Sequence, residues 1–241
     1  MKFQTVLPIL AAATAATVMA QAPAAPKSGP ALRSVNQTFY TDRTELLAEW
    51  RPIVAAENTR FSAHLTKVGD RFQAYSAAKV TLTLTVDGSV VEAKVEAPER
   101  PGVFRLPFTA PKVGKGRIVV EVVADGPAER FVLEDVPVYA SVQDAMAKQT
   151  PAETGLISYS KETQWDSDYA SATVGKALTV PAAAVVQEEG KSYVYVQRTP
   201  ERFELRVVQT GKRTGDLLQI AGGLRDGERI VVAGADKMPR K

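Results

Sequence analysis

Apolar and polar residues alternate strictly in the first half of the chain. In residues 80–86 (VTLTLTV), valine or leucine occupies every second position and threonine lies between them. A period of two is typical of a strand with one buried face. Asp87 and Gly88 tolerate the positive φ of a tight turn, and residues 90–95 (VVEAKV) follow as the returning strand. The pattern therefore predicts a β-hairpin.

Two further apolar runs indicate more strands. They cover residues 118–124 and 131–139, and the turn-forming sequence Asp125-Gly126-Pro127 separates them. Several short strands joined by such turns favour a β-sandwich. Prolines lack the amide hydrogen of an interior ladder, so four of them are expected at sheet edges or in loops: Pro98, Pro101, Pro107 and Pro111. Residues 44–50 (TELLAEW) fit either one helical turn or a short edge strand, and the following Arg51-Pro52 ends any helix.

The pattern changes between residues 141 and 178. Residues 144–149 (DAMAKQ) and 160–169 (SKETQWDSDY) are compatible with short helices, and Ser160 suits the N-cap of the second. We expect this segment to be a linker and not part of a core. Strand patterns then return at residues 178–180, 192–197, 202–209, 217–221 and 229–233. The expected fold class is all-β, with a small second β domain after the linker.

The N-terminus has the features of a secretory signal. Lys2 precedes an apolar run over residues 6–18, and Val18-Met19-Ala20 forms a small-residue cleavage pattern. We expect cleavage after Ala20; the alternative is an uncleaved anchor, although the run is shorter than the ~20 residues that span a bilayer. Residues 21–36 are rich in proline, alanine, serine and glycine, which predicts a flexible leader.

Composition excludes several function classes. The chain has no cysteine, which excludes disulfides, thiolate chemistry and cysteine zinc sites. The 30 basic and 27 acidic residues give a net charge of +3, and the basic residues are spread along the chain. Nucleic acid is therefore not an expected partner.

Metal binding is not expected either. His64 is the only histidine, and one imidazole without a second histidine or a cysteine cannot form an ordinary zinc site. We expect it to be a strand histidine with a local hydrogen bond. After removal of the signal, only Met146 and Met238 remain as thioether side chains, and they lie far apart in the sequence. We predict no metal site and no cofactor.

Other candidate residues have structural explanations. Trp165 is expected to fill the gap between two modules, with a recognition anchor as the alternative. Gly211 and the pair 222–223 are expected in turns, since no helix signal follows them as in a phosphate-binding loop. The acidic pairs 134–135 and 188–189 have no partner at a defined spacing and are expected on the solvated surface. We predict no catalytic residue and no enzyme.

Five stretches, in order, resemble one protein family. They are residues 61–66 (FSAHLT), 100–105 (RPGVFR), 161–169 (KETQWDSDY), 179–197 (TVPAAAVVQEEGKSYVYVQ) and 223–228 (GLRDGE). Together they are similar to the periplasmic adaptor subunits, or membrane fusion proteins, of heavy-metal resistance-nodulation-division (RND) efflux pumps. The resemblance rests on the order of these motifs more than on any single one.

The resemblance implies a domain organisation. It assigns residues 37–140 to an immunoglobulin-like β-sandwich, 141–178 to a linker with short helices, and 179–241 to a membrane-proximal-type β-barrel or β-roll domain. Family members carry a lipoyl-like domain, an α-helical hairpin and most of a barrel between the linker motif and the valine-proline motif. Here only residues 171–179 separate the two matches, which is too short for any of these parts.

The resemblance also implies a function. We expect a non-catalytic periplasmic adaptor-like subunit of a heavy-metal efflux system, with the inner-membrane pump as its partner and the membrane surface close by. Residues 179–238 are expected to carry the docking. Two alternatives stay open: a stand-alone periplasmic accessory or metal- or ligand-binding module that reuses adaptor domains, and a decayed adaptor. Self-association is left open.

Overall fold

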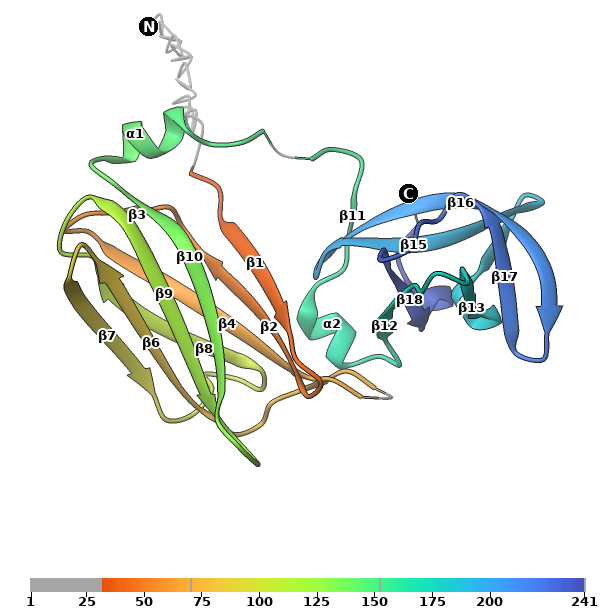
Figure 1. Ribbon diagram of the computed structural model, residues 1–241, viewed down its shortest axis with the longest axis horizontal. Coiled ribbons are helices and arrows are strands. Elements are labelled where there is room, and N and C mark those ends of the chain that lie inside the picture. The colour runs from red at the N-terminus through yellow and green to blue at the C-terminus, as the bar shows by residue number, and fades with distance from the viewer. Residues whose placement is uncertain (1–31, 70, 152, 241) are drawn as a thin grey trace, which may run out of the picture. The chain divides into compact units, whose positions relative to one another are not determined.

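The computed structural model describes residues 32–69, 71–151 and 153–240 (Figure 1). The expected signal peptide, residues 1–20, and residues 21–31 of the expected leader lie outside the described residues. The last two leader residues belong to the first strand, which begins at Val35. No helix in the described part of the chain is long and apolar enough to cross a membrane.

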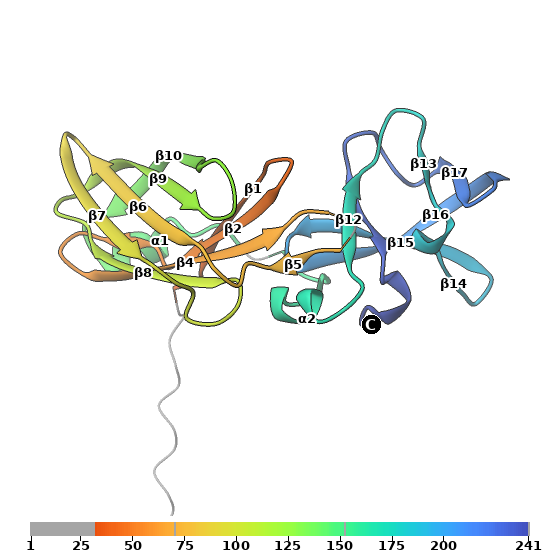
Figure 2. The same cartoon turned by 90° about the horizontal axis from the view of Figure 1, so that it is seen from below.

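Two five-stranded sheets form a β-sandwich over residues 35–139 (Figures 1 and 2). The first sheet has the order β1 (Val35–Tyr40), β2 (Thr44–Trp50), β4 (Asn58–Lys67), with β5 (Gln73–Ala74) and β8 (Val103–Thr109) both pairing with β4. The second has the order β3 (Ile53–Val54), β10 (Glu129–Tyr139), β9 (Gly114–Val123), β6 (Lys79–Val86), β7 (Ser89–Val95). The two sheets enclose a single hydrophobic core.

The alternating pattern correctly predicted the β6–β7 hairpin. The valines and leucines of β6 are completely buried, while its threonines are only partly buried. Asp87 and Gly88 have φ values of 39° and 78°, as a tight hairpin turn requires. The expected positions of the prolines are also confirmed: Pro107 lies in the edge strand β8, and the other three lie outside the strands.

The expectation for residues 44–50 was wrong. They form neither a helical turn nor an edge strand but β2, which pairs with β1 on one side and β4 on the other. Leu46, Ala48 and Trp50 enter the sandwich core. Thr44 and Glu45 are also completely buried, and Glu45 is covered by a residue far along the chain. A local pattern cannot predict such cover.

Residues 141–178 contribute to a core, contrary to the expectation of a linker alone. They contain α1 (Val142–Ala147), β11 (Ile157–Ser158), α2 (Lys161–Trp165) and β12 (Ala170–Thr173). Strand β11 pairs with β16, and β12 pairs with β18. Tyr159 and Tyr169 are buried in the same cluster as Phe203. The segment is thus part of the second β domain, because its two strands pair with strands of that domain.

The second domain completes the all-β fold class predicted from the sequence. Its main sheet has the order β12, β18 (Arg229–Ala233), β15 (Lys191–Thr199), β16 (Arg202–Thr214), β17 (Leu217–Gly222), β13 (Thr179–Pro181), and β14 (Val186–Glu188) pairs with β15. Strand β16 pairs first with β15 and then, beyond Val208, with β17. Tyr195 packs in one hydrophobic cluster, whereas Val194 and Val196 pack in another, so both faces of β15 are buried.

Candidate functional site

Helix α2 begins with an N-cap that the sequence predicted. The Ser160 hydroxyl accepts a hydrogen bond from the Thr163 amide at 3.3 Å, and the Lys161 amide donates to the Glu201 carboxylate at 2.7 Å. These two acceptors satisfy amides that the first turn of a helix leaves unpaired. The turn of α2 that they fix carries the side chain of Lys161 inward.

Lys161 and Glu45 form an ion pair that is completely buried. The Lys161 ammonium contacts the Glu45 carboxylate, and both side chains have 0% exposure. Glu45 lies on β2 and Lys161 on α2, so the pair joins the sandwich to the segment that precedes β12. Removing each charge from water costs roughly several kcal/mol. The attraction between the two charges and further hydrogen bonds must offset this cost.

Polar and aromatic groups surround both charges. Glu45 accepts hydrogen bonds from the hydroxyls of Tyr40 at 2.8 Å and Thr66 at 3.4 Å. The Lys161 ammonium donates to the Gln164 side-chain carbonyl at 2.9 Å. It also lies 5.8 Å from the ring centroid of Phe72 and 6.0 Å from that of Tyr169, within cation–π range. These groups replace part of the water that burial removes from the two side chains.

Burial dominates the electrostatics of this cluster. It lowers the pKa of Lys161, and the nearby Glu45 carboxylate opposes that shift. Burial also raises the pKa of Tyr40, with Glu45 acting in the same direction. The phenol therefore stays protonated and donates to the carboxylate.

Gln164 and Trp165 extend the junction on either side. The Gln164 amide donates to the carbonyls of Tyr159 at 2.8 Å and Pro200 at 2.6 Å, which ties α2 to the second domain. The Trp165 indole donates to the Thr66 hydroxyl at 2.9 Å, which ties α2 to β4. A Cβ on Gly102 would lie 2.4 Å from the Trp165 ring, so the indole packs directly on that backbone. The predicted packing role of Trp165 is confirmed.

Charged side chains of the second domain also reach the sandwich. The Arg229 guanidinium lies 3.9 Å from the ring centroid of Tyr40 and donates to the Ser171 hydroxyl at 2.9 Å. Asp168 pairs with Arg71 at 2.9 Å and with Lys237 at 3.0 Å, and these two cations lower the pKa of Asp168. These contacts add further links between the second domain and the sandwich.

His64 lies beside the junction, but the expected local hydrogen bond is missing. The residue is 8% exposed, its Nδ1 is buried without a partner, and its Nε2 is 3.8 Å from the Glu49 carboxylate, too far for a hydrogen bond. Its ring faces that of Trp165 at a centroid distance of 6.4 Å. Burial lowers the pKa of His64 below the usual 6.5, opposed by Glu162 and Glu49. The folded protein therefore holds the imidazole neutral.

The remaining candidate residues lie apart from the junction. Residues 134–135 form a bulge between β10 and β9, where Glu134 pairs with Arg117 and Asp135 with Lys115. Glu188 pairs with Arg240 near the C-terminus.

The two methionines do not form a metal site. Met238 is buried in a hydrophobic cluster, and Met146 lies on α1. Within residues 32–69, 71–151 and 153–240, no group of three or more histidine, cysteine, aspartate or glutamate side chains is placed to hold a metal ion.

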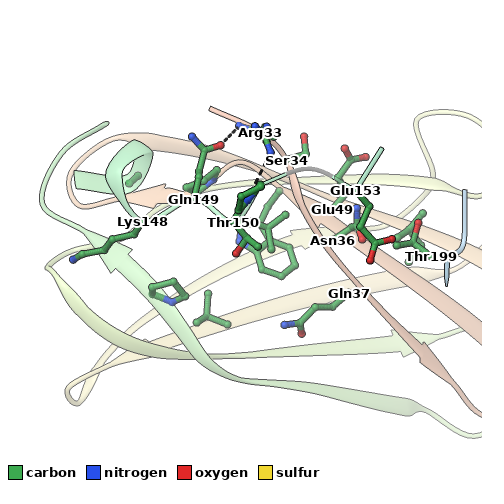
Figure 3. A pocket seen from close by; sticks show the side chains of 18 of the residues that line it. Arg33, Ser34, Asn36, Gln37, Glu49, Lys148, Gln149, Thr150, Glu153 and Thr199 are labelled. Carbon is green, nitrogen blue, oxygen red and sulfur yellow. Dashed lines mark hydrogen bonds between the residues drawn. The ribbon is translucent and has the colours of Figure 1, made fainter. Parts of the chain in front are cut away.

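A groove of about 750 Å³ lies beside the same junction (Figure 3). One wall is the start of β1, and the other is α1 with the segment that follows it. The Arg33 guanidinium donates to the Thr150 carbonyl at 3.0 Å and holds the two walls together. Glu49 and Glu201 also line the groove. No residue pattern in the sequence indicated this groove, because its lining comes from five separate stretches of the chain.

Comparisons with known proteins support the C-terminal part of the resemblance. Residues 177–239 match the family model of the C-terminal permuted SH3-like domain of YknX. This range covers β13 to β18, and it supports an adaptor-type domain at this end of the chain. No curated protein matches the chain.

One solved structure also matches. It is the crystal structure of ZneB from Cupriavidus metallidurans, with 16% sequence identity and a TM-score of 0.22. The alignment covers 73% of this chain and 40% of the ZneB chain. The chain therefore spans less than half of the length of that protein.

Removing one partner of the buried ion pair will destabilise the protein strongly. Lys161→Met leaves the Glu45 carboxylate buried without a cation, which lowers the free energy of unfolding by about 3–5 kcal/mol. The double variant Glu45→Gln with Lys161→Met restores most of the loss, because it leaves no unpaired charge. Urea unfolding, followed by circular dichroism, measures the free energy of unfolding of the original protein and of both variants.

The matched control is Lys237→Met, which removes a lysine from an ion pair with Asp168 whose side chains are 54% and 58% exposed. This change lowers the free energy of unfolding by less than about 1 kcal/mol. Equal effects of the two lysine substitutions would contradict the role given to the buried pair.

Stability will fall as the pH drops through the ordinary pKa of histidine. Because the folded pKa of His64 is lowered, the unfolded chain binds a proton in a range where the folded chain does not, so acid favours unfolding. Melting temperatures measured from about pH 8 to about pH 5 should show a smaller decline for His64→Gln than for the original protein. Parallel declines would show that His64 is not the group responsible.

Proposed function

We propose that this protein is a non-catalytic periplasmic adaptor-like subunit of a heavy-metal efflux system, which docks on the inner-membrane pump. The observation that carries the proposal is the match of residues 177–239 to a known C-terminal domain, at the place where the ordered sequence motifs predict the membrane-proximal-type domain. The motifs before it extend the resemblance to the sandwich and to α2. The metal-exporting role and the periplasmic location rest on this resemblance.

The junction suits such a subunit in physical terms. An adaptor binds its pump through one domain while its other domain extends away from that contact. A defined connection between the two domains therefore helps it to bind. The buried pair of Lys161 and Glu45 and the hydrogen bonds of Gln164 and Trp165 restrain α2 from both sides. Helix α2 is thus held by long-range contacts and not by its own five residues alone.

The β16–β17 hairpin is the surface that we assign to docking. Residues 209–214 of β16 are all exposed and include Lys212 and Arg213. Val207 and Leu217, on the two strands, are 51% and 49% exposed. Val207 lies where β16 still pairs with β15, so Leu217, which pairs with Thr214 at the hairpin tip, is the apolar residue beside these cations. An exposed apolar side chain beside cations is a common composition for a protein interface, where the apolar part contributes affinity and the charges contribute orientation.

A second candidate function is a stand-alone periplasmic accessory or ligand-binding module. The groove of about 750 Å³ beside β1 favours it, because that volume is in the range of small-ligand sites. Normal export and folding in cells that lack the pump, together with ligand binding by the purified chain, would support this function over the first.

Charge reversal on the hairpin tests the first proposal. The double variant Lys212→Glu with Arg213→Glu should reduce association with the inner-membrane pump roughly tenfold, since each exposed ion pair contributes up to about 1 kcal/mol. Co-purification from membranes and titration by biolayer interferometry measure the change.

The matched control makes the same charge change on the sandwich, with Lys79→Glu and Lys94→Glu, whose side chains are 67% and 58% exposed. Its association with the pump should equal that of the original protein. The proposal fails if the unaltered chain does not associate with the pump under conditions in which a full-length adaptor does.

A further inference from the structure

The groove beside β1 has an open strand edge as one of its walls. Strand β1 lies at the end of its sheet and pairs only with β2, so its outer main-chain groups have no strand partner within the described residues. Val35, Asn36 and Gln37 are exposed and line the groove. Toward the other end of β1, Thr38 and Phe39 are partly buried, and Arg229 packs over the Tyr40 ring. The open part is therefore a short edge at the start of the strand.

This edge has none of the usual protection against pairing. Exposed edges are normally blocked by lysine, proline or a bulge, and the β1 sequence VNQTFY pairs with β2 in an unbroken register and contains neither residue type. An extended segment can add to such an edge through main-chain hydrogen bonds. The shape of the groove thus indicates an extended chain as its occupant.

Five acidic and three basic residues line the groove. Of the basic residues, Lys148 pairs with the Asp144 carboxylate, whereas Arg33 donates to the Thr150 carbonyl and Arg202 to the Ser158 hydroxyl, both of which are neutral. Three of its five acidic residues have cationic partners as well, namely Glu134 with Arg117, Asp135 with Lys115 and Glu153 with Arg198.

The other two carboxylates lack a cation. Glu49 has only the imidazole of His64 nearby, at 3.8 Å, and Glu201 accepts the main-chain amide of Lys161. No lysine or arginine side chain in the described part of the chain forms an ion pair with either. Burial raises the pKa of Glu201, and Glu49 acts in the same direction, as expected for carboxylates that share a site. In Figure 3, Glu49 lies toward one end of the groove and Lys148 toward the other.

Apolar residues complete the lining. Leu47, Pro52, Val136 and Leu156 come from both sheets of the sandwich and from the segment before β11. A strand that adds to an edge points successive side chains in opposite directions. Leu47 and Glu49 are two positions apart on β2 and lie on the same face of the sheet. Side chains on one face of an added strand would therefore meet both an apolar residue and a carboxylate.

We propose that this groove binds an extended basic peptide segment of a partner protein, added as a strand to the open edge of β1, with its lysine or arginine side chains paired to Glu49 and Glu201. The site is separate from the hairpin assigned to pump docking. It requires neither a pump nor a metal, so its test is independent of the proposed function.

Binding of short synthetic peptides to the purified chain tests this proposal. A fluorescent peptide that alternates lysine and valine should bind, and one that alternates glutamate and valine should not. Glu49→Gln should weaken binding about tenfold, the effect of one charge-assisted hydrogen bond, and the further change Glu201→Gln about as much again. The control Glu92→Gln, on the exposed strand β7, should leave binding unchanged. Melting curves verify that each variant folds. If the double variant does not fold, the binding measured for Glu49→Gln alone tests the proposal.

Hydrogen exchange identifies the mode of binding. The lysine peptide should slow exchange of amides in residues 35–38, because strand addition gives outward-facing amides a partner. The proposal is overturned if neither peptide binds, if both bind equally, if Glu49→Gln has no effect, or if β1 is not protected.

A second copy of this chain is the competing occupant. Because the sequence has no cysteine, Val35→Cys introduces a single thiol at the open edge. The protein should stay monomeric on gel filtration, and the thiol should stay available to a maleimide until the lysine peptide is added. Rapid formation of a disulfide-linked dimer, with a dimeric native protein, would assign the edge to self-association and overturn the proposal.

Discussion

The buried ion pair of Lys161 and Glu45 is the constraint on which the junction depends. A fully buried lysine is tolerated only where a carboxylate and further acceptors replace its water, so α2 must hold Lys161 directly against β2. Once it does, Gln164 reaches the carbonyls of Tyr159 and Pro200, and Trp165 reaches Thr66. The position of a five-residue helix, too short to be stable by itself, is thus determined by contacts outside it.

The sequence predicted those features whose cause is local. Alternation identified β6, the Asp87-Gly88 turn identified its hairpin, and Ser160 identified the start of α2. It did not predict β2 as a central strand or residues 157–173 as part of a core. The burial of Glu45 depends on a lysine 116 positions later in the chain, and charged residues are normally exposed. Contacts with residues far along the chain, and not local sequence preference, thus determine the placement of β2 and of residues 157–173.

The join between the two matched stretches is a continuous part of the structure. Residues 170–173 form β12, which pairs with β18, and the Val174 amide then donates to the Glu228 carbonyl at 2.8 Å. The Leu178 amide closes a turn on Gly175 at 2.9 Å, and β13 begins at the next residue. Residues 170–178 thus supply one strand and one tight turn to the second domain.

Glu201 connects the groove to the junction. Its carboxylate accepts the Lys161 amide at 2.7 Å and also lines the groove. Lys161 is therefore held twice, through its side chain by Glu45 and through its main chain by Glu201. A cation that pairs with Glu201 competes with the Lys161 amide for the same carboxylate. Occupation of the groove and the geometry of the first turn of α2 are thus coupled through a single carboxylate.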